Sequence, residues 1–314
     1  MSLVPPTVAL DPFGDDFLAA PYDFHAELRD VAPVFLMEKY NIFGIARYEQ
    51  VAAVLKDYET FCSSRGVGLT DFALEEPWRP ASLLLETDPP LHHQTRQIMN
   101  RVVSPQALKR VRQKWAERAG ELVDRLANGN RFDAITDCAE VFPMVVFPQT
   151  IGLREDGLEN LLPYAVAAFN AFGPPNPLRE DALAAAVEPT KWVNESCKRE
   201  NLKPGGWGLQ VYAAADQGLC SEEDAARLVR SFLTAGVDTT INGIGNLLFA
   251  LGSNPEQFEH LKQNPGLVRR AFEEALRWDS TAQTFFRTVK RRSKGTPDRR
   301  RRGTPFSDNM MLVC

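Results

Sequence analysis

The stretch Ala235-Gly236-Val237-Asp238-Thr239-Thr240 places a carboxylic acid beside an alcohol, next to a glycine, within a long apolar helix. The sequence predicts this helix from Ser221, a good N-cap before three acidic residues, to Gly252. A glycine inside a helix costs roughly 0.5–1 kcal/mol relative to alanine, so this interruption needs a reason. Proton delivery by the acid and the alcohol is one reason. The alternative is a helix bent at Gly236, with the Thr239 hydroxyl bonded to a carbonyl one turn earlier.

A second signal is the pair Glu274 and Arg277, three residues apart on an amphipathic helix predicted for about residues 265–278. This spacing places both charges on one helix face, either as a buried clamp or as a common surface ion pair. The same pattern recurs at Glu76-Pro77-Trp78-Arg79. The spacing alone therefore leaves both alternatives open.

Upstream of these signals, Asp88-Pro89-Pro90 is followed by His92 and Arg96, four residues apart on one face of a predicted helix start. Taken alone, they are an ordinary partly exposed histidine and a solvated helix charge. In chain order, however, the Asp-Pro-Pro stretch, the Ala-Gly-x-Asp-Thr-Thr stretch, the Glu-x-x-Arg pair and Arg287 resemble the bacterial cytochromes P450. The resemblance runs from about Asp11 to Arg287.

The resemblance implies a mainly α, incomplete cytochrome P450 fold with a small N-terminal β component, formed by one domain over residues 1–287. It also implies a haem-thiolate monooxygenase, an oxidoreductase that uses O2 and a b-type haem. Asp238 and Thr239 then relay protons to iron-bound dioxygen. The resemblance assigns the haem propionates to three basic side chains, those of His92, Arg96 and Arg287. It gives Glu274 and Arg277 a structural role.

Within the family, the chain is similar to the branch that oxidises para-substituted benzoates by hydroxylation or O-demethylation. The resemblance assigns the substrate carboxylate to two arginines and two serines, Arg79, Ser82, Arg230 and Ser231. Donors of this kind hold a carboxylate, although Arg230 also fits a salt-bridged helix position. Phe169 and Phe172 are assigned to the aromatic ring, and their three-residue spacing fits a core position equally well.

The resemblance also requires a cysteine thiolate on the iron, because electron donation from the thiolate favours cleavage of the O–O bond. The family places this cysteine in a glycine-rich loop well beyond the Glu-x-x-Arg helix, and the chain ends first. The chain has five cysteines, none in that context: Cys62, Cys138, Cys197, Cys220 and Cys314. We therefore assign no metal ligand and expect a C-terminally truncated copy with doubtful activity.

Residues 288–314 differ in composition from the rest of the chain. They hold eight basic and two acidic side chains, a net charge of +6, which leaves −11 for the remainder of a chain with −5 in total. A basic run is able to bind nucleic acid or an anionic membrane, but here it lacks interleaved aromatics and an accompanying fold. We expect neither partner and predict a disordered tail, or one translated out of frame.

Two functions from other classes remain open. In the first, the chain is a non-catalytic remnant or pseudogene product that folds poorly without its cofactor. A sharply melting monomer without haem would contradict it. In the second, the chain is a haem-free module that binds aromatic acids, which titration with benzoate tests.

The composition is typical of a globular enzyme, with 44% hydrophobic and 25% charged residues among 314. No run approaches the roughly 18 apolar residues of a membrane helix, and the N-terminal residues lack a signal-peptide pattern. Five cysteines without close pairs favour a reducing compartment. We therefore expect a cytoplasmic monomer without membrane partners.

The resemblance further implies electron supply by a ferredoxin with an NAD(P)H-dependent reductase. Five basic side chains are candidates for docking an acidic ferredoxin, namely Arg101, Lys109, Arg110, Arg112 and Lys114. A solvated helix face is an equally good interpretation of this cluster.

Most of the chain is predicted to be helical. One helix begins at Pro105 after the N-cap Ser104 and ends before Gly129. Another spans about residues 178–200, with a kink at Pro189.

Strand patterns are sparse and lie near the N-terminus, at residues 34–36 and 42–46. Residues 169–177, which include three prolines, form a predicted loop over the pocket. We find no internal repeat and no long linker, so the sequence favours one domain.

Overall fold

The computed structural model describes residues 5–129, 131–290 and 309–313, the last group by its backbone alone. The chain forms two compact units. The first unit comprises residues 1–93, 170–180 and 282–314, and the second comprises residues 94–169 and 181–281. Both units are discontinuous in sequence, so each depends on contacts between distant parts of the chain.

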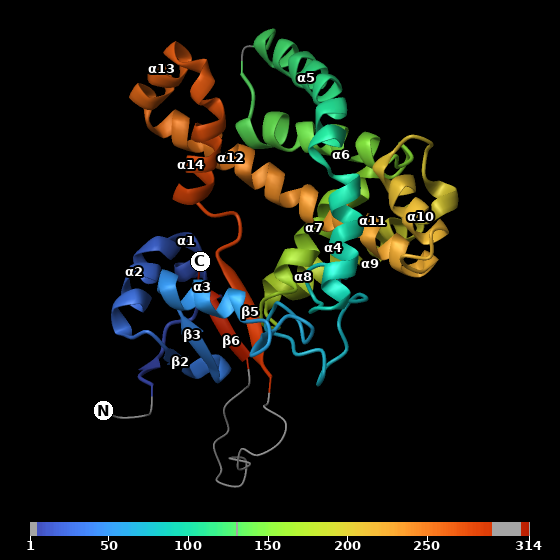
Figure 1. Cartoon of the computed structure of the whole chain (residues 1–314). Helices are drawn as coiled ribbons and strands as arrows, with labels where there is room; N and C mark the ends of the chain where they lie inside the picture. Colours follow the sequence, from blue (N-terminus) through green and yellow to red (C-terminus); the bar gives the residue numbers. More distant parts are fainter. Residues whose placement is uncertain (1–4, 130, 291–308, 314) are drawn as a thin grey trace. The chain divides into compact units, whose positions relative to one another are not determined.

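A six-stranded mixed sheet forms the framework of the first unit, in the order β1-β2-β3-β6-β5-β4 (Figure 1). Its strands are β1 Thr7–Val8, β2 Phe35–Met37, β3 Ile42–Ile45, β4 Phe61–Cys62, β5 Thr284–Val289 and β6 Asn309–Val313. β1 pairs with β2 and β3 pairs with β6 in parallel, whereas the other neighbours are antiparallel. The predicted strands at 34–36 and 42–46 correspond to β2 and β3. The sequence did not reveal that strands from the far end of the chain complete their sheet.

The C-terminal residues enter this sheet in part. Thr288 and Val289 belong to β5, and the backbone of Asn309–Val313 forms β6 between β3 and β5. Residues 291–308 and 314 lie outside the described residues. The predicted disordered or out-of-frame tail therefore stays a prediction.

Helices α1 Asp15–Ala19, α2 Pro21–Val31 and α3 Tyr48–Lys56, with the short η1 Glu38–Tyr40, complete the first unit beside the sheet (Figure 1). Phe35 of β2 is fully buried and packs with Leu28 of α2 and Phe286 of β5. Gly44 faces the Phe35 ring so closely that an added Cβ would lie 2.2 Å from a ring carbon. Only glycine at this position lets the ring cross the neighbouring strand.

The second unit consists of helices. Its elements are α5 Pro105–Ala127, η2 Ala134–Ala139, α6 Val141–Ile151, η3 Leu158–Asn160, α7 Leu161–Asn170, α8 Pro177–Ala185, α9 Val187–Ser196, η4 Arg199–Asn201, α10 Trp207–Asp216, α11 Glu222–Gly236, α12 Asp238–Ser253, α13 Pro255–Gln263, η5 Pro265–Leu267 and α14 Val268–Trp278. Three of the described helices cross the boundary between the units. α4 Leu91–Val102 begins in the first unit and continues into the second. The last residue of α7 and the first residues of α8 belong to residues 170–180 of the first unit. The prediction of a mainly α fold with a small β component is confirmed.

The predicted N-cap of α5 is confirmed, because the Ser104 hydroxyl accepts a hydrogen bond from the Ala107 backbone N–H at 3.3 Å. The prediction of one helix over about residues 178–200, kinked at Pro189, is wrong in its continuity, although an interruption lies close to the predicted kink. The chain forms α8 and α9, with the break at Ala186. Pro189 has no N–H to donate to the carbonyl of Ala185, and this missing hydrogen bond explains the interruption one turn before the proline.

The prediction of one continuous helix from Ser221 to Gly252 is also wrong, because α11 ends at Gly236 and α12 begins at Asp238. The break lies within the stretch Ala235-Gly236-Val237-Asp238-Thr239-Thr240. An added Cβ at Gly236 would lie 2.9 Å from the ring of Phe147, so this ring packs directly on the helix backbone. The two helices are joined through Val237, which is fully buried.

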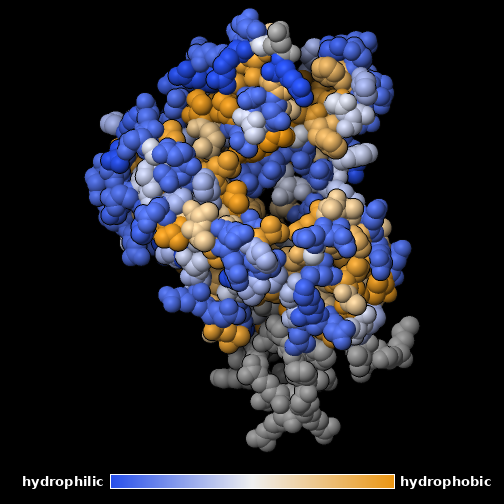
Figure 2. Space-filling view, turned by 180° about the vertical axis from the view of Figure 1, so that it is seen from behind, coloured by the Kyte–Doolittle hydropathy of each residue, from blue (hydrophilic) through white to orange (hydrophobic). Residues whose placement is uncertain are grey.

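The end of α12, together with α13 and α14, presents apolar side chains to solvent. The most exposed large ones are Phe249, Phe258, Val268 and Trp278. Figure 2 shows apolar residues at the molecular surface among hydrophilic ones. A groove between these helices is lined by Leu247, Leu251, Leu261 and Ala271, among others. Along the described residues, no helix is both long and apolar enough to cross a membrane.

Candidate active site

The acid of the candidate proton relay lies at the start of α12. Asp238 is half-buried, and its carboxylate accepts a hydrogen bond from Nδ2 of Asn242 at 2.9 Å. Burial raises the pKa of Asp238 and outweighs this hydrogen bond, which acts in the opposite direction. A carboxyl group whose pKa is shifted toward neutrality binds and releases a proton more readily near pH 7. The side chain is therefore chemically suited to proton transfer.

The alcohol of the relay is bonded to the helix backbone. The Thr239 hydroxyl donates a hydrogen bond of 2.6 Å to the carbonyl oxygen of Ala235, across the break between α11 and α12. This is the geometry that the alternative interpretation predicted. This geometry is also compatible with a proton relay. A hydroxyl that donates its hydrogen to one partner keeps lone pairs that accept a hydrogen bond from a second partner.

Arg230 and Ser231 lie on α11, about two turns before the break. Arg230 is 4% exposed, and the Ser231 hydroxyl donates to the carbonyl oxygen of Arg227 at 3.1 Å. One turn later, the Thr234 hydroxyl lies 3.3 Å from that of Tyr164, a fully buried residue of α7. This buried polar pair was not predicted. The only signal in the sequence was that Thr234 directly precedes Ala235 and Gly236.

Arg79 and Ser82, the other predicted carboxylate ligands, lie in the first unit with a third residue, Glu86. The guanidinium of Arg79 donates from Nη1 to Oε2 of Glu86 at 3.0 Å and from Nη2 to Oε1 at 3.4 Å. The Ser82 backbone N–H donates to the same Oε2 at 2.5 Å. Both charged side chains are only 3% exposed. In the sequence, Glu76 is the acid spaced for Arg79, and Glu86 was not recognised as its partner.

The turn from Ser82 to Glu86 explains why these residues meet. The Ser82 hydroxyl accepts hydrogen bonds from the backbone N–H groups of Leu84 and Leu85, at 3.3 and 3.2 Å. The Ser82 carbonyl in turn accepts from the backbone N–H of Glu86 at 3.0 Å. This local bonding resembles a helix capping arrangement and returns the Glu86 carboxylate to the Ser82 backbone. The hydroxyl of Ser82 thus serves the turn.

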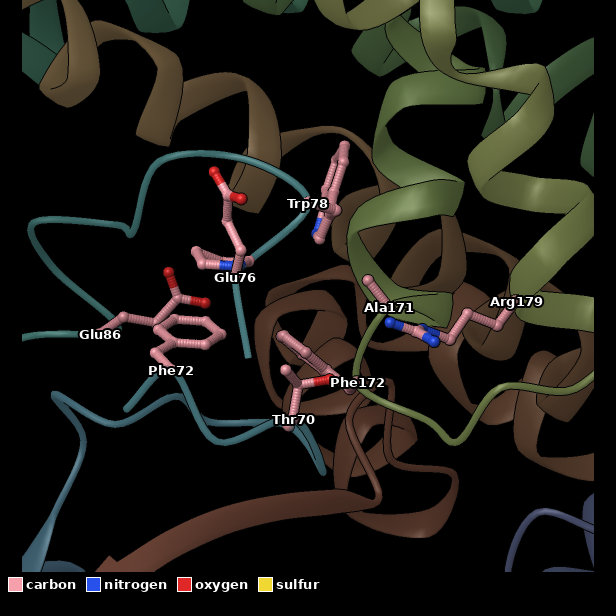
Figure 3. Close-up of a pocket in the computed structure, with 10 residues that line it drawn as sticks. Thr70, Phe72, Glu76, Trp78, Glu86, Ala171, Phe172 and Arg179 are labelled. Atoms are coloured by element: carbon pink, nitrogen blue, oxygen red, sulfur yellow. The ribbon is translucent and has the colours of Figure 1, made fainter. Parts of the chain in front are cut away.

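A small pocket of the first unit lies beside this cluster and is lined by Glu86, Trp78, Thr70, Phe172 and Arg179, among others (Figure 3). Its enclosed volume is about 20 Å³, room for roughly one water molecule. Figure 3 shows Glu86 at one side of the pocket and Arg179 at the other. The Nε of Arg179 is buried and has no hydrogen-bond partner among the residues that the structure describes.

The two predicted ring-binding residues fall in different units. Phe172 lines the pocket of the first unit, and its carbonyl accepts a hydrogen bond from the Leu69 backbone N–H at 2.8 Å. Gly68 lies against it, since an added Cβ would be 2.6 Å from Cα of Phe172. Phe169 belongs to the last turn of α7. The predicted loop at 169–177 is shorter in the structure, because α7 extends to Asn170 and α8 begins at Pro177.

The predicted haem propionate ligands lie on α4 and β5. His92 and Arg96 are one turn apart on α4, with His92 half-buried and Arg96 exposed. Arg287 of β5 is half-buried, and its Nη1 donates to the carbonyl oxygen of Phe286 at 2.7 Å. All three side chains offer N–H donors, the chemistry that propionate carboxylates require.

Asp88, which opens the Asp-Pro-Pro stretch, has a structural environment. Its carboxylate accepts hydrogen bonds from the backbone N–H groups of Ser63 at 2.9 Å and Ser64 at 3.3 Å, and Lys290 lies 3.5 Å away. Burial alone would raise the pKa of Asp88, but these hydrogen bonds and the charge of Lys290 lower it below its ordinary value. Asp88 therefore remains a carboxylate that anchors the start of α4.

Glu274 and Arg277 form a bidentate pair on α14, with hydrogen bonds of 2.7 and 2.6 Å. The side chains are 58% and 69% exposed. The pair lowers the pKa of Glu274 and raises that of Arg277, as an ion pair does. Of the two alternatives, the surface ion pair is therefore the correct one, and the buried clamp is wrong.

The described cysteines do not present a thiolate for iron. Cys62 and Cys197 are buried and Cys138 and Cys220 half-buried, all as free thiols. Burial raises the pKa of Cys138 and of Cys220, and it raises the pKa of Cys197 to about 12. Cys314 lies outside the described residues. None of these four cysteines therefore fits as the axial ligand of a haem.

Two further observations concern metal and partner sites. Among the residues that the structure describes, no group of three or more His, Cys, Asp or Glu side chains is placed to hold a metal ion. The predicted docking bases are all exposed. Lys109 and Arg112 line an open groove of α5 together with the apolar Leu108, Trp115 and Phe142.

Comparison with known proteins identifies relatives of the chain. It is 50% identical over 287 residues to cytochrome p450 CYP199A2 of Rhodopseudomonas palustris, covering 91% of this chain and 70% of the relative. It is 24% identical over 287 residues to the putative cytochrome P450 123 of Mycobacterium tuberculosis, covering 90% of this chain and 71% of that protein. The structure of epothilone D-bound cytochrome P450epoK has the same fold, with a TM-score of 0.79 at 21% identity over 98% of this chain and 78% of that chain. No family model matches the chain.

Proposed function

This chain belongs to the cytochrome P450 family of haem-thiolate monooxygenases, and we propose that it hydroxylates or O-demethylates a para-substituted aromatic carboxylic acid. The observation that carries the proposal is the burial of two arginines near serines, Arg79 at 5% and Arg230 at 4% exposure. A guanidinium removed from water requires an anion or several hydrogen bonds to offset its lost hydration. Glu86 supplies such an anion to Arg79, and the carboxylate of an aromatic acid is an anion of the same kind.

The aromatic ring of the substrate requires apolar walls. Phe172 is the candidate for one wall in the first unit. Phe169 supplies another from α7. With its carboxylate bound at one end of the ring, the substrate has its para substituent at the opposite end. This orientation selects the para carbon as the position of reaction.

The chemistry at the para position requires protons as well as electrons. When bound, the haem supplies oxygen activation, so that one oxygen atom of O2 enters the substrate and the other leaves as water, with two electrons and two protons consumed. Asp238, whose pKa is raised by burial, holds a proton for delivery. The Thr239 hydroxyl donates its own hydrogen to the carbonyl oxygen of Ala235, so its oxygen is left as a hydrogen-bond acceptor. It thereby fixes the direction in which the proton is delivered. A methoxy substrate loses its methyl carbon as formaldehyde.

The remaining predicted residues bind the cofactor or support the fold. His92, Arg96 and Arg287 hold the haem propionates by charge-assisted hydrogen bonds. Glu274 and Arg277 act structurally. A ferredoxin, reduced by an NAD(P)H-dependent reductase, docks at the basic side chains of α5, where Lys109 and Arg112 flank an apolar groove.

The product assay tests the function directly. The haem-loaded full chain with ferredoxin, reductase and NADH should convert 4-methoxybenzoate into 4-hydroxybenzoate and formaldehyde, and 4-methoxybenzamide should react far more slowly. Replacement of Arg79 by Ala should weaken benzoate binding by about 1–3 kcal/mol. Equal turnover of acid and amide would refute the carboxylate preference.

The cofactor has a separate readout. The ferrous carbon monoxide difference spectrum of the full chain, expressed with ample haem, tests for an axial thiolate, which none of the four described cysteines supplies. A red-shifted Soret band would show that Cys314 takes this role. Absence of this band would show that the family chemistry is not retained by this chain.

A further inference from the structure

The guanidinium of Arg79 is already occupied by a carboxylate of this chain. Glu86 accepts from both terminal nitrogens of Arg79, at 3.0 and 3.4 Å, and from the Ser82 backbone N–H at 2.5 Å. The donors that Glu86 uses thus come from the same two residues that the proposed function assigns to the substrate carboxylate. Glu86 therefore mimics a bound aromatic acid at this end of the site.

Electrostatics make the two carboxylates mutually exclusive. The side chains of Arg79 and Glu86 are each 3% exposed, so their charges neutralise one another in a poorly hydrated environment. A second carboxylate at Arg79 would leave one uncompensated negative charge there, where repulsion is stronger than in water. Glu76, which lines the pocket beside Glu86, is exposed, so the buried Glu86 is the carboxylate that sets this repulsion. An external acid consequently competes with Glu86 for one cation.

Arg79 also has a donor that Glu86 does not use. Its Nε is buried and has no hydrogen-bond partner within the described part of the chain. An arginine offers five N–H donors, and the edge that includes Nε is a recognised position for a carboxylate. An incoming acid is therefore able to bond to this edge before Glu86 leaves the other one.

We propose that Glu86 is an internal competitor of the substrate, so that an aromatic carboxylate binds Arg79 by exchange with the Glu86 carboxylate. This inference rests on the proposed function, because it concerns the same carboxylate-binding residues. It makes Glu86 a specificity-determining residue. Only a ligand that brings its own anion replaces the charge that Arg79 loses, and a neutral analogue leaves the Arg79–Glu86 pair intact.

The test uses the purified full chain and calorimetric titration with 4-methoxybenzoate and with its neutral analogue 4-methoxybenzamide. Replacement Glu86→Gln removes the competing charge and keeps the size of the side chain. We expect the affinity for 4-methoxybenzoate to rise about tenfold or more, because charge-assisted hydrogen bonds of Arg79 become available, with no change for the amide. Unchanged or weaker binding of the acid would overturn the proposal.

Two control variants locate the effect. Glu274→Gln removes the negative charge of an exposed bidentate Glu–Arg pair on α14, and it should leave both affinities unchanged. Adding Arg79→Gln to Glu86→Gln should abolish the gain, because the competed cation is gone. A gain that survives this second change would show that the acid binds elsewhere and would refute the exchange at Arg79.

A second substitution keeps the proposal testable if Glu86→Gln does not fold. Glu86→Asp retains the charge but shortens the side chain by one methylene, which weakens its reach to Arg79. The acid should then bind more tightly than to the unaltered chain, by a smaller factor than with Gln. Equal or weaker binding to this variant would also overturn the proposal.

The unaltered chain separates this inference from the proposed function. If it binds acid and amide equally, the proposed substrate class fails whatever the variants show. If it prefers the acid and Glu86→Gln brings no gain, the substrate class stands and the role of Glu86 fails.

Discussion

Two bidentate Glu–Arg pairs of the described residues differ in their surroundings. The side chains of Arg79 and Glu86 are each 3% exposed in the first unit. Those of Glu274 and Arg277, on α14 of the second unit, are 58% and 69% exposed. In water, the loss of an ion pair is nearly balanced by renewed hydration of each charge. In a buried pair, removal of one partner leaves the other without hydration or a counter-charge. Similar hydrogen-bond geometry therefore has different energetic consequences.

The largest effect is expected from breaking the buried pair. Arg79→Ala should lower the free energy of unfolding by about 3–5 kcal/mol, because the Glu86 carboxylate stays buried without its partner. Arg277→Ala, the matched change in the exposed pair, should have a far smaller effect. Denaturant unfolding of both variants measures the difference, and equal losses would contradict the comparison.

Replacing both buried partners by apolar residues sharpens the comparison. Arg79→Met combined with Glu86→Leu should be neutral or stabilising by about 1–4 kcal/mol, because no charge is left in the poorly hydrated site. The same double variant should lose its preference for 4-methoxybenzoate over the amide. Thermal and denaturant unfolding measure stability, and a loss as large as that of Arg79→Ala alone would refute the electrostatic explanation.

His25 extends the comparison to a buried ionisable side chain with no counter-charge. It is 2% exposed, and its Nε2 has no hydrogen-bond partner among the described residues. Burial, with a smaller contribution from the charge of Arg29, lowers the pKa of His25 below its ordinary 6.5. The unfolded chain thus takes up a proton before the folded chain does. Stability is present above pH 6.5 and lost as the pH falls through the lowered pKa.

The measurement is the unfolding free energy between pH 7.5 and pH 5. His25→Gln should remove part of its decrease at low pH, because the ionisable group is gone. An unchanged slope with His25→Gln would show that His25 does not contribute.

The smallest effects concern two acids with opposite pKa shifts. The pKa of Asp238 is raised by burial, so its unfavourable contribution is absent below pH 3.8 and develops as the pH rises through the folded pKa. The pKa of Glu274 is lowered by Arg277, so its favourable contribution is present above pH 4.5 and lost as the pH falls through the folded pKa. At pH 7, Asp238→Asn should stabilise the chain and Glu274→Gln should slightly destabilise it. Changes of the same sign would contradict this assignment.

Residues close in sequence were the more predictable part of the structure. The N-cap at Ser104, the helix that follows it, and strands β2 and β3 depend on local hydrogen bonds and side-chain alternation, and all were predicted. The stretch around Gly236 was recognised as special, and a bend at Gly236 was one of its two interpretations, but the full break between α11 and α12 was not predicted. That break involves the ring of Phe147, which packs against Gly236 from another helix.

The candidate site shows the same division. The order of the motifs identified the family, which the relative of 50% identity confirms. The sequence also pointed to Arg79 and Arg230, and both are buried. It missed Glu86, because the spacing of Glu76 offered Arg79 a nearer partner. It also missed the contact between Tyr164 and Thr234, which lie on different helices.

The sequence by itself determined the family, the helical character of the chain and the residue types available to a haem and to an aromatic acid. These follow from motif order, periodicity and local capping, which act over a few residues. The tertiary structure alone decided which carboxylate neutralises Arg79, that Glu274 and Arg277 are exposed, and that β5 and β6 complete the N-terminal sheet. Burial and pairing decide these outcomes, and both depend on which distant segments of the chain the fold brings together.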